Sequence, residues 1–364
     1  MNVPLLDLKA QYHSIKKELD AALLKTAESQ YFILGPDVKK LEDSICENLN
    51  VKHAIGVSSG TDALLLALMA LDIKAGDEVI VPTYSFFATA GVVSRLNAIP
   101  IFIDIDPVTM NIDPEKIENK ITSKTKAIIP VHLYGQSADM EPIMEIANKH
   151  GLYVIEDAAQ AVGAEYKNKK TGSLGTIGCF SLHPLKNLSA IGDGGMITCN
   201  DESIYRKLLL LRNHGLKNRD ECVLWGFNSR LDSIQSVILE VKLKNLQKWT
   251  SRRREIAQLY QSSLQDIVTV PHEKEHEKAV YHTFIIQTDH RDALMEFLAN
   301  NNIDTKIHYP IPIHLQSASK YLGYKNGDFP VAEKQSNRIL SLPIFPGLSN
   351  DQVNYVIEKI REYY

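Results

Sequence analysis

The chain has 364 residues, 44% of them hydrophobic, which is enough to bury a large core and to form two or three domains. Its 40 basic and 44 acidic residues give a formal net charge of −4, and this balance argues against a nucleic-acid-binding protein. The four cysteines (Cys46, Cys179, Cys199 and Cys222) lack a metal-like spacing, the N-terminal residues do not resemble a signal peptide, and no apolar run is long enough to span a membrane, so we expect a cytoplasmic protein without disulfides.

Short apolar runs alternate with amphipathic segments over the first two-thirds of the chain. The expected strands are His53–Ser59, Glu78–Pro82, Pro100–Ile105, Ala127–Leu133, Tyr153–Asp157, Gly178–Leu182 and Met196–Cys199, and the helix-like segments between them include Thr61–Leu71, Ala88–Leu96 and Met140–His150. This alternation predicts an α/β fold with a mostly parallel seven-stranded sheet flanked by helices. Ligands bind such sheets beyond the carboxyl ends of the strands.

The pattern changes near residue 240. Two helix-like segments, Ser229–Gln247 and Arg252–Leu264, precede a strand-like segment at Ala279–Gln287, and the chain closes with helix-like segments at Arg291–Asn300 and Asp351–Tyr364. We therefore expect a large domain over residues 1–240, including the N-terminal segment, and a smaller C-terminal α+β domain over residues 241–364.

Two segments of the large domain could bind a charged ligand. Ser59, Gly60 and Thr61 lie between a strand and a strongly apolar helix, where free N–H groups and the helix dipole favour a phosphate; an ordinary N-cap without a ligand is the alternative. The strand Tyr153–Asp157 ends in a carboxylate that could hold a protonated ring nitrogen. A helix N-cap or a surface acid is the alternative there.

Lys186 lies in a loop between two expected strands, five residues after Ser181 and shortly before Gly192, Gly194 and Gly195. A lysine that forms a Schiff base must be deprotonated and must reach one fixed carbonyl carbon, which a loop at a sheet edge allows. An exposed loop lysine is the alternative. Ser181 could contribute a hydroxyl to a phosphate, and one edge of the sheet could collect all three features.

With these features in this order, the chain resembles the DegT-type sugar aminotransferases, a branch of the fold-type-I pyridoxal-phosphate (PLP) enzymes. The resemblance covers nearly the whole chain. It is carried by the segments SSGTDALLLAL, GDEVIVPTYSFFATA, IIPVHLYGQSADM, IEDAAQAVGA, SLHPLKNL with the following GDGG, and HYPIPIHLQ.

The resemblance implies roles for the matching positions. Lys186 matches the lysine that binds the cofactor covalently, and Asp157 matches the partner of the pyridine nitrogen. The other implied cofactor contacts are Gly60, Thr61, Phe86, Gln160, Ser181 and Asn228, the last donated by the neighbouring subunit of a homodimer. His308, Tyr309 and Arg230 are implied on the substrate side; a buried structural pair at 308–309 and a salt bridge within the chain at Arg230 are the alternatives.

The implied reaction moves an amino group from L-glutamate to a keto-sugar linked to dTDP or UDP. The segment DAAQ, which ends in Gln160, favours amination at C3, whereas the pair His183-Pro184 is found in enzymes that act at C4. Amination of a cyclitol such as scyllo-inosose stays open. Lys186 argues against relatives that carry His at this position and dehydrate or deoxygenate sugars.

Particular residues argue against two other classes of protein and against a metal site. A non-catalytic regulator on this fold is expected to lose Lys186 or Asp157, and both are present. A nicotinamide-dependent enzyme needs a G-x-G-x-x-G turn after its first strand, and the turn here is SSGTDA. His272 and His276 have a spacing that can bind a metal, but their highly charged surroundings indicate a solvated loop, so we expect no metal site.

Overall fold

The computed structural model describes residues 1–364 and has a seven-stranded sheet at its centre. Its strands are β1 (His53–Val57), β2 (Glu78–Pro82), β3 (Ile99–Ile103), β4 (Thr125–Ile128), β5 (Tyr153–Asp157), β8 (Ile177–Ser181) and β9 (Gly195–Cys199), in the spatial order β1-β9-β8-β5-β4-β2-β3. Strand β9 pairs antiparallel with both of its neighbours, and the other pairs are parallel. The mostly parallel seven-stranded sheet predicted from the sequence is confirmed.

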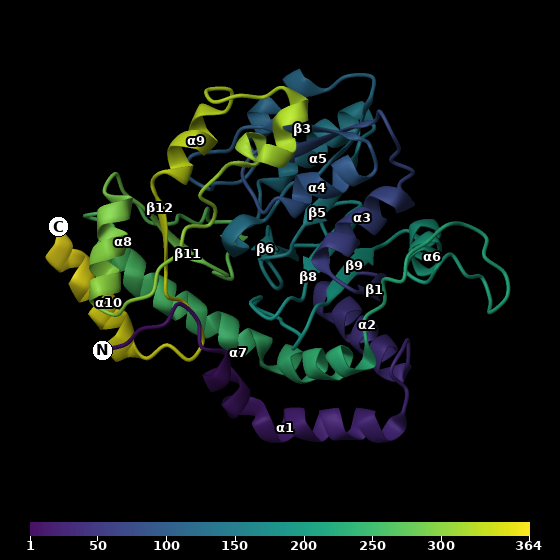
Figure 1. Ribbon diagram of the computed structural model, residues 1–364, viewed down its shortest axis with the longest axis horizontal. Helices are drawn as coiled ribbons and strands as arrows, with labels where there is room; N and C mark the ends of the chain where they lie inside the picture. The colour runs from purple at the N-terminus through teal and green to yellow at the C-terminus, as the bar shows by residue number, and fades with distance from the viewer.

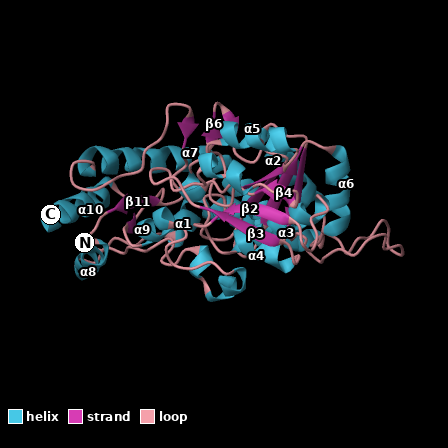
Figure 2. Ribbon diagram, turned by 90° about the horizontal axis from the view of Figure 1, so that it is seen from above, coloured by secondary structure: helices cyan, strands magenta, loops and turns pink.

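Helices cover both faces of this sheet (Figure 2). One face packs against α3 (Gly60–Ala70), α4 (Ala88–Arg95) and α6 (Glu202–Leu211), and the other against α2 (Pro36–Leu49), α5 (Met140–His150) and α7 (Ser233–Leu264). On β2, Val79 and Val81 belong to the cluster with α3, whereas Ile80 belongs to the cluster with α5. Strands buried on both sides appear in the sequence as continuous apolar runs, which is why they could be found there.

A smaller α+β part lies beside the sheet and contains both chain termini (Figure 1). Strands β11 (Phe284–Gln287) and β12 (Ile339–Leu342) pair antiparallel, and α8 (Arg291–Asn300) and α10 (Asn350–Tyr363) pack with them on the C-terminal half of α7. The first residues of the chain join this part, since Val3 is fully buried in its core and forms a bridge with Ile303.

The remaining elements complete the chain. They are α1 (Leu8–Ser29), which packs along α7, α9 (Pro330–Ser336), the strands β6 (Glu165–Tyr166), β7 (Lys169–Lys170) and β10 (Glu277–Lys278), and 3-10 helices at Pro114–Lys116, Glu118–Lys120, Leu133–Gly135, Ile313–Leu315 and Ser317–Leu322. The four cysteines are free thiols. None of the helices combines the length and the apolar character needed to cross a membrane.

Helix α7 is continuous, whereas the sequence predicted two helices separated at residues 248–251. These residues include no glycine or proline to end a helix, and Trp249 and Thr250 are buried against neighbouring elements, so packing carries the helix through. The expected strand at Ala279–Gln287 is regular only over β11. The domain boundary that we place at residue 240 falls inside α7, which contributes Leu239 to the core beside the sheet and Tyr260 to the core of the smaller part.

Candidate active site

A cavity of about 390 Å³ lies at the carboxyl ends of the parallel strands, where the sheet meets the smaller part. It brings together nine of the side chains or backbone positions that the sequence singled out, namely Gly60, Thr61, Phe86, Asp157, Gln160, Ser181, Lys186, His308 and Tyr309. These residues come from β1–α3, the loop before α4, the end of β5, the end of β8 and the segment before the Ile313–Leu315 turn. The chain therefore collects distant segments at the sheet edge where ligands of this architecture bind.

Asp157 ends β5 and is 5% exposed. The hydroxyl of Thr89, in α4, donates to Oδ2 at 2.8 Å, and the backbone N–H of Ala159 donates to Oδ1 at 3.2 Å. Burial raises the pKa of Asp157, while these donors and the positive charge of Lys186 act in the opposite direction. The result is a buried carboxylate in a fixed orientation that still lacks a full counter-charge.

Lys186 lies in the loop from β8 to β9. Its N–H donates to the carbonyl of His183 at 2.8 Å, and the side chain of Asn187 donates to the carbonyl of Val280 at 3.1 Å, which ties the loop to the smaller part. Burial lowers the pKa of the Lys186 amine to about 8, against the pull of Asp157. The amine is therefore about half neutral at pH 8, where an ordinary lysine is almost wholly protonated, and the neutral form is the one that acts as a nucleophile or a base.

The start of α3 forms an anion-binding end of the cavity. Ser59 is the N-cap, and its hydroxyl accepts from the N–H of Asp62 at 3.0 Å, while the N–H groups of Gly60 and Thr61 donate to no protein acceptor. A Cβ atom on Gly60 would lie 2.6 Å from the Cβ of Ser181, so glycine is needed for α3 to approach β8 this closely. Free amides, a helix dipole and the hydroxyl of Ser181 converge there, as a phosphate group requires.

Aromatic and amide side chains form the remaining walls. Phe86 is 43% exposed, and its ring centroid lies 5.9 Å from that of Tyr309. Gln160 accepts from the N–H of Tyr134 at 2.6 Å and donates from Nε2 to the Tyr309 hydroxyl at 3.1 Å. Phe86 is thus free to lie against a flat ring, whereas Gln160 also fixes the position of Tyr309.

Two histidines face the cavity from the smaller part. His308 was identified from the sequence, and its Nδ1 lies 2.9 Å from the hydroxyl of Ser341. His282 was missed; its Nδ1 lies 3.3 Å from Oδ1 of Asn187, next to Lys186. Burial, followed by neighbouring positive charges, lowers the pKa of His308 to about 4 and that of His282 well below its ordinary value. Both imidazoles are therefore neutral at pH 7.

Asn228 and Arg230 lie outside the cavity of their own chain. Asn228 is exposed and bridges to Asn213 in the segment after α6. Nη1 of Arg230 donates to Oδ1 of Asn213 at 3.0 Å, and its Nε is buried without a partner. A single chain therefore does not bring these two residues to Lys186. His272 and His276 belong to no group of side chains that is placed to hold a metal.

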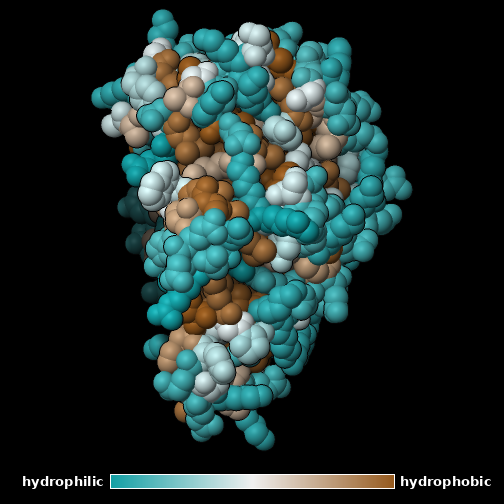
Figure 3. All heavy atoms as spheres, turned by 90° about the vertical axis from the view of Figure 1, so that its right-hand side faces the viewer, coloured by the Kyte–Doolittle hydropathy of each residue, from teal (hydrophilic) through white to brown (hydrophobic).

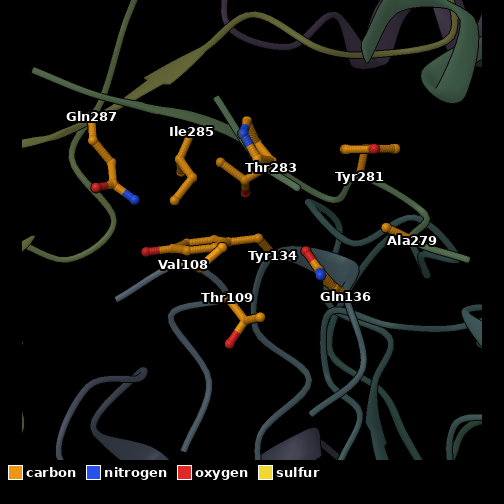
Figure 4. Close-up of a pocket in the computed structure, with 10 residues that line it drawn as sticks. Val108, Thr109, Tyr134, Gln136, Ala279, Tyr281, Thr283, Ile285 and Gln287 are labelled. Atoms are coloured by element: carbon orange, nitrogen blue, oxygen red, sulfur yellow. The ribbon is translucent and has the colours of Figure 1, made fainter. Parts of the chain in front are cut away.

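A second, much smaller cavity lies between the loop of Val108 and Thr109 and the segment 279–287 (Figure 4). Its volume of about 20 Å³ is enough for roughly one water molecule and too small for a substrate. Tyr134 lies across it, and the Tyr134 hydroxyl donates to the carbonyl of His308. Tyr134 therefore holds the His308 segment in place beside this cavity, and the cavity itself is too small to be a binding site for the reaction.

Comparison with known proteins identifies the family. Residues 13–361 match the model of the DegT/DnrJ/EryC1/StrS aminotransferase family. A "pleiotropic regulatory protein" of Geobacillus stearothermophilus is 49% identical over 100% of this chain and 99% of its own length. The dTDP-3-amino-3,6-dideoxy-alpha-D-galactopyranose transaminase of Aneurinibacillus thermoaerophilus is 44% identical over 99% of each chain.

Solved structures agree with this assignment. DesV of S. venezuelae, crystallised in complex with a ketimine intermediate, superimposes with a TM-score of 0.98 at 39% identity, covering 100% of this chain and 98% of DesV. The PLP-form of Spr1654 from Streptococcus pneumoniae superimposes with a TM-score of 0.90 at 26% identity over 95% of each chain. With the cavity geometry described above, these matches show that the chain belongs to the DegT/DnrJ/EryC1/StrS aminotransferase family of PLP-dependent enzymes.

Proposed function

We propose that this protein transfers an amino group from L-glutamate to a nucleotide-linked keto-sugar, with PLP as its cofactor and a dTDP- or UDP-linked 3-keto hexose as the favoured acceptor. The observation that carries the proposal is the meeting of Lys186, whose pKa burial lowers to about 8, and the buried carboxylate of Asp157 in one cavity. A lysine of low pKa and a carboxylate held in place are the two groups that this chemistry requires.

The residues present fit PLP. The free N–H groups of Gly60 and Thr61 and the hydroxyl of Ser181 would hold its phosphate, Asp157 would hold its ring nitrogen, and Phe86 would lie against the ring. Asp157 is a buried acid that lacks a full counter-charge, which a protonated ring nitrogen would supply. When bound, PLP supplies a ring that accepts the electron pair released at the carbon bearing the transferred nitrogen.

The chain's own residues then have distinct tasks. We assign to the Lys186 amine the removal of the proton from the α-carbon of the donor, because the amine lines the cavity and burial lowers its pKa to about 8. Asp157 would hold the proton at the ring nitrogen. His282 and His308 stay neutral, so they can donate or accept a hydrogen bond to a substrate without adding a positive charge beside Lys186.

Amination at C3 is favoured over the alternatives. The Aneurinibacillus relative, 44% identical, is named for a 3-amino sugar linked to dTDP, and Gln160 agrees with that assignment. A 4-keto sugar nucleotide and a cyclitol remain the alternative acceptors. The relative from Geobacillus is named as a regulator. A purely regulatory role gives no reason to keep Lys186 and Asp157 in a formed cavity, so we favour catalysis.

The test of this function is the visible absorption of the protein with PLP, before and after addition of L-glutamate. We expect the band of the lysine-linked cofactor to form, to disappear with glutamate, and to return with a dTDP-linked 3-keto sugar but less readily with the 4-keto isomer. The Lys186→Ala variant should not form the lysine-linked band. A wild-type band that glutamate leaves unchanged would refute transamination from this donor.

We also propose a homodimer in which Asn228 of the partner subunit completes each cavity. The segment after α6 stands away from the rest of the chain (Figure 1), and it exposes Trp225 by 89% and Phe227 by 42%. Figure 3, viewed from that side, shows apolar patches among the polar residues of this face. Exposed aromatic side chains of this size are typical of association surfaces.

Mixing two inactive variants tests the shared site. A dimer of Lys186→Ala and Asn228→Ala subunits contains one cavity with both native residues, so a 1:1 mixture that has exchanged subunits should regain about a quarter of the wild-type activity. If Asn228 acts within its own chain, the mixture will show only the average of the activities of the two variants.

The proposed location of the protein is the cytoplasm, because an exposed free thiol such as Cys222 persists in a reducing compartment.

A further inference from the structure

Arg253 is a buried cation that no carboxylate of the chain neutralises. It lies in α7 and is 5% exposed. Both of its hydrogen bonds leave from Nη1, to the carbonyl oxygens of Tyr281 at 3.1 Å and Ile344 at 2.7 Å, and it forms no ion pair. The next residue, Arg254, differs in that its guanidinium pairs with Glu273 at 2.6 Å. Because an unpaired charge is costly to bury, we expect Arg253 to bind an anion that does not belong to the chain.

Arg253 lines two cavities that adjoin the candidate active site. One has a volume of about 210 Å³ and also has Lys186 in its wall. The other, which we call the Arg253 cavity, has a volume of about 150 Å³ and is lined by Arg253, Lys306, His282, His308 and six uncharged residues, with no Asp or Glu among them. His282 and His308 also line the active-site cavity. A positively charged chamber therefore lies directly beside Lys186.

The charges in this chamber act on one another. Burial lowers the pKa of Arg253 only to about 10, so the guanidinium stays charged at pH 7. After burial, the positive charges of Lys186 and Arg253 lower the pKa of His282, and those of Lys306 and Lys186 lower the pKa of His308. Both histidines are neutral and can donate or accept hydrogen bonds, so the net charge comes from Arg253 and Lys306.

We propose that the Arg253 cavity binds a carboxylate of the amino donor, with Arg253 and Lys306 as donor-binding residues. This inference rests on the proposed transamination. The amino donor bears its α-carboxylate on the same carbon as the amino group, so that carboxylate must lie beside Lys186 when the amine reacts. A guanidinium with free Nε and Nη2 presents the parallel N–H pair that matches a carboxylate.

The alternative anion is the diphosphate of the acceptor. A diphosphate is bonded to a sugar on one side and to a nucleoside on the other, so it needs a groove open at both ends. A chamber of about 150 Å³ between β12 and the N-terminal segment, with Leu5, Leu6 and Ile344 in its wall, matches a small planar anion better. The two sources are separated by measuring the donor and the acceptor independently.

The experiment compares Arg253→Lys and Lys306→Gln with wild type and with a control, Arg254→Gln. Arg254 belongs to the same helix, but its charge is neutralised by Glu273 within the chain. The PLP-loaded proteins are titrated calorimetrically with glutarate, a dicarboxylate without an amino group, and the KM values for L-glutamate and for the keto-sugar nucleotide are measured. We expect the glutarate Kd and the glutamate KM to rise at least tenfold in Arg253→Lys and at least threefold in Lys306→Gln, with the acceptor KM within twofold of wild type in both.

The outcomes separate this inference from the proposed function. Unchanged glutarate and glutamate constants in both variants would overturn the inference, and so would a rise confined to the acceptor KM, which would assign the chamber to the diphosphate. Lys306 is exposed and forms no ion pair, so Lys306→Gln decides the question alone if Arg253→Lys does not fold. If wild type binds glutarate through Arg253 but glutamate leaves its absorption band unchanged, the carboxylate chamber stands and transamination fails.

Discussion

Replacing Lys186 by methionine should stabilise the protein that has been freed of PLP. The folded state lowers the pKa of this amine from 10.5 to about 8, because burial opposes its charge. At about 1.4 kcal/mol for each tenfold change in proton affinity, this difference corresponds to about 3 kcal/mol that protonated Lys186 subtracts from the free energy of unfolding. Methionine has a similar length and carries no proton, so it removes this cost.

The expected gain at pH 7 is about 1–2 kcal/mol, below the full value for two physical reasons. Lys186 is half-buried, so solvent screens part of its charge, and Asp157 loses a nearby positive charge in the variant. The pH dependence has a definite sign. As the pH falls below 8, the protonated amine predominates in the folded as well as the unfolded chain, and the cost approaches its full value. Between pH 8 and 10.5 the folded chain has released its proton, so the cost declines as the pH rises and is absent above 10.5.

Urea unfolding of wild type and Lys186→Met at pH 7 and at pH 10, at one protein concentration, measures this gain. Lys244→Met is the matched control, because Lys244 is exposed and forms no ion pair, and we expect it to stay within about 0.5 kcal/mol of wild type at both values. The reasoning is refuted if Lys186→Met is no more stable than wild type at pH 7. It is equally refuted if its advantage does not shrink between pH 7 and pH 10.

Two further substitutions probe the cofactor end of the cavity. Asp157→Asn keeps the shape of the side chain but cannot hold a positive ring nitrogen. Because it removes one partner of a buried charge pair, kcat/KM for transamination should fall by at least about a hundredfold, while the circular dichroism spectrum stays unchanged. Activity within tenfold of wild type would contradict this role of Asp157. Gly60→Ala places a Cβ atom 2.6 Å from that of Ser181 and should cost about 1–3 kcal/mol in urea unfolding and weaken PLP binding. Gly91→Ala, in α4, is the control, because a Cβ atom there meets no other atom within 4 Å; it should leave the free energy of unfolding and the affinity for PLP unchanged.

Segments with strong local patterns were predictable from the sequence. The parallel strands are buried on both faces, so their apolar runs stand out, and the polar residues that follow them, such as Asp157, lie at the ligand edge by the geometry of the sheet. The start of α3 was equally visible, because a strand, Ser59-Gly60 and an apolar helix are contiguous. The length of α7 was not predictable, because residues 248–251 are kept helical by burial of Trp249 rather than by strong helix propensity.

Arg253 and His282 were missed for a different reason. In the sequence Arg253 is one of three consecutive arginines on a charged, amphipathic segment, which indicates a solvated face. The partners of these arginines become distinguishable only in the folded chain. Arg254 pairs with Glu273, whereas Arg253 donates to the carbonyl groups of Tyr281 and Ile344. Arg253 is therefore distinguished by having no carboxylate partner, and this is a property of three-dimensional packing that the sequence does not show.

Gln160 shows how a residue assigned from the sequence can act through a neighbour. Its carbonyl oxygen accepts from the N–H of Tyr134 and its amide donates to the Tyr309 hydroxyl, so both ends of the side chain are engaged within the chain. The backbone N–H of Tyr309 in turn donates to the hydroxyl of Tyr84 at 2.7 Å. A histidine in place of Gln160 would place its one donor and one acceptor at other positions, because the imidazole ring is rigid and its side chain is shorter, so it would not keep both contacts. The residue at position 160 therefore sets where Tyr309 stands, and this is a physical route by which it could influence which carbon of the sugar faces Lys186.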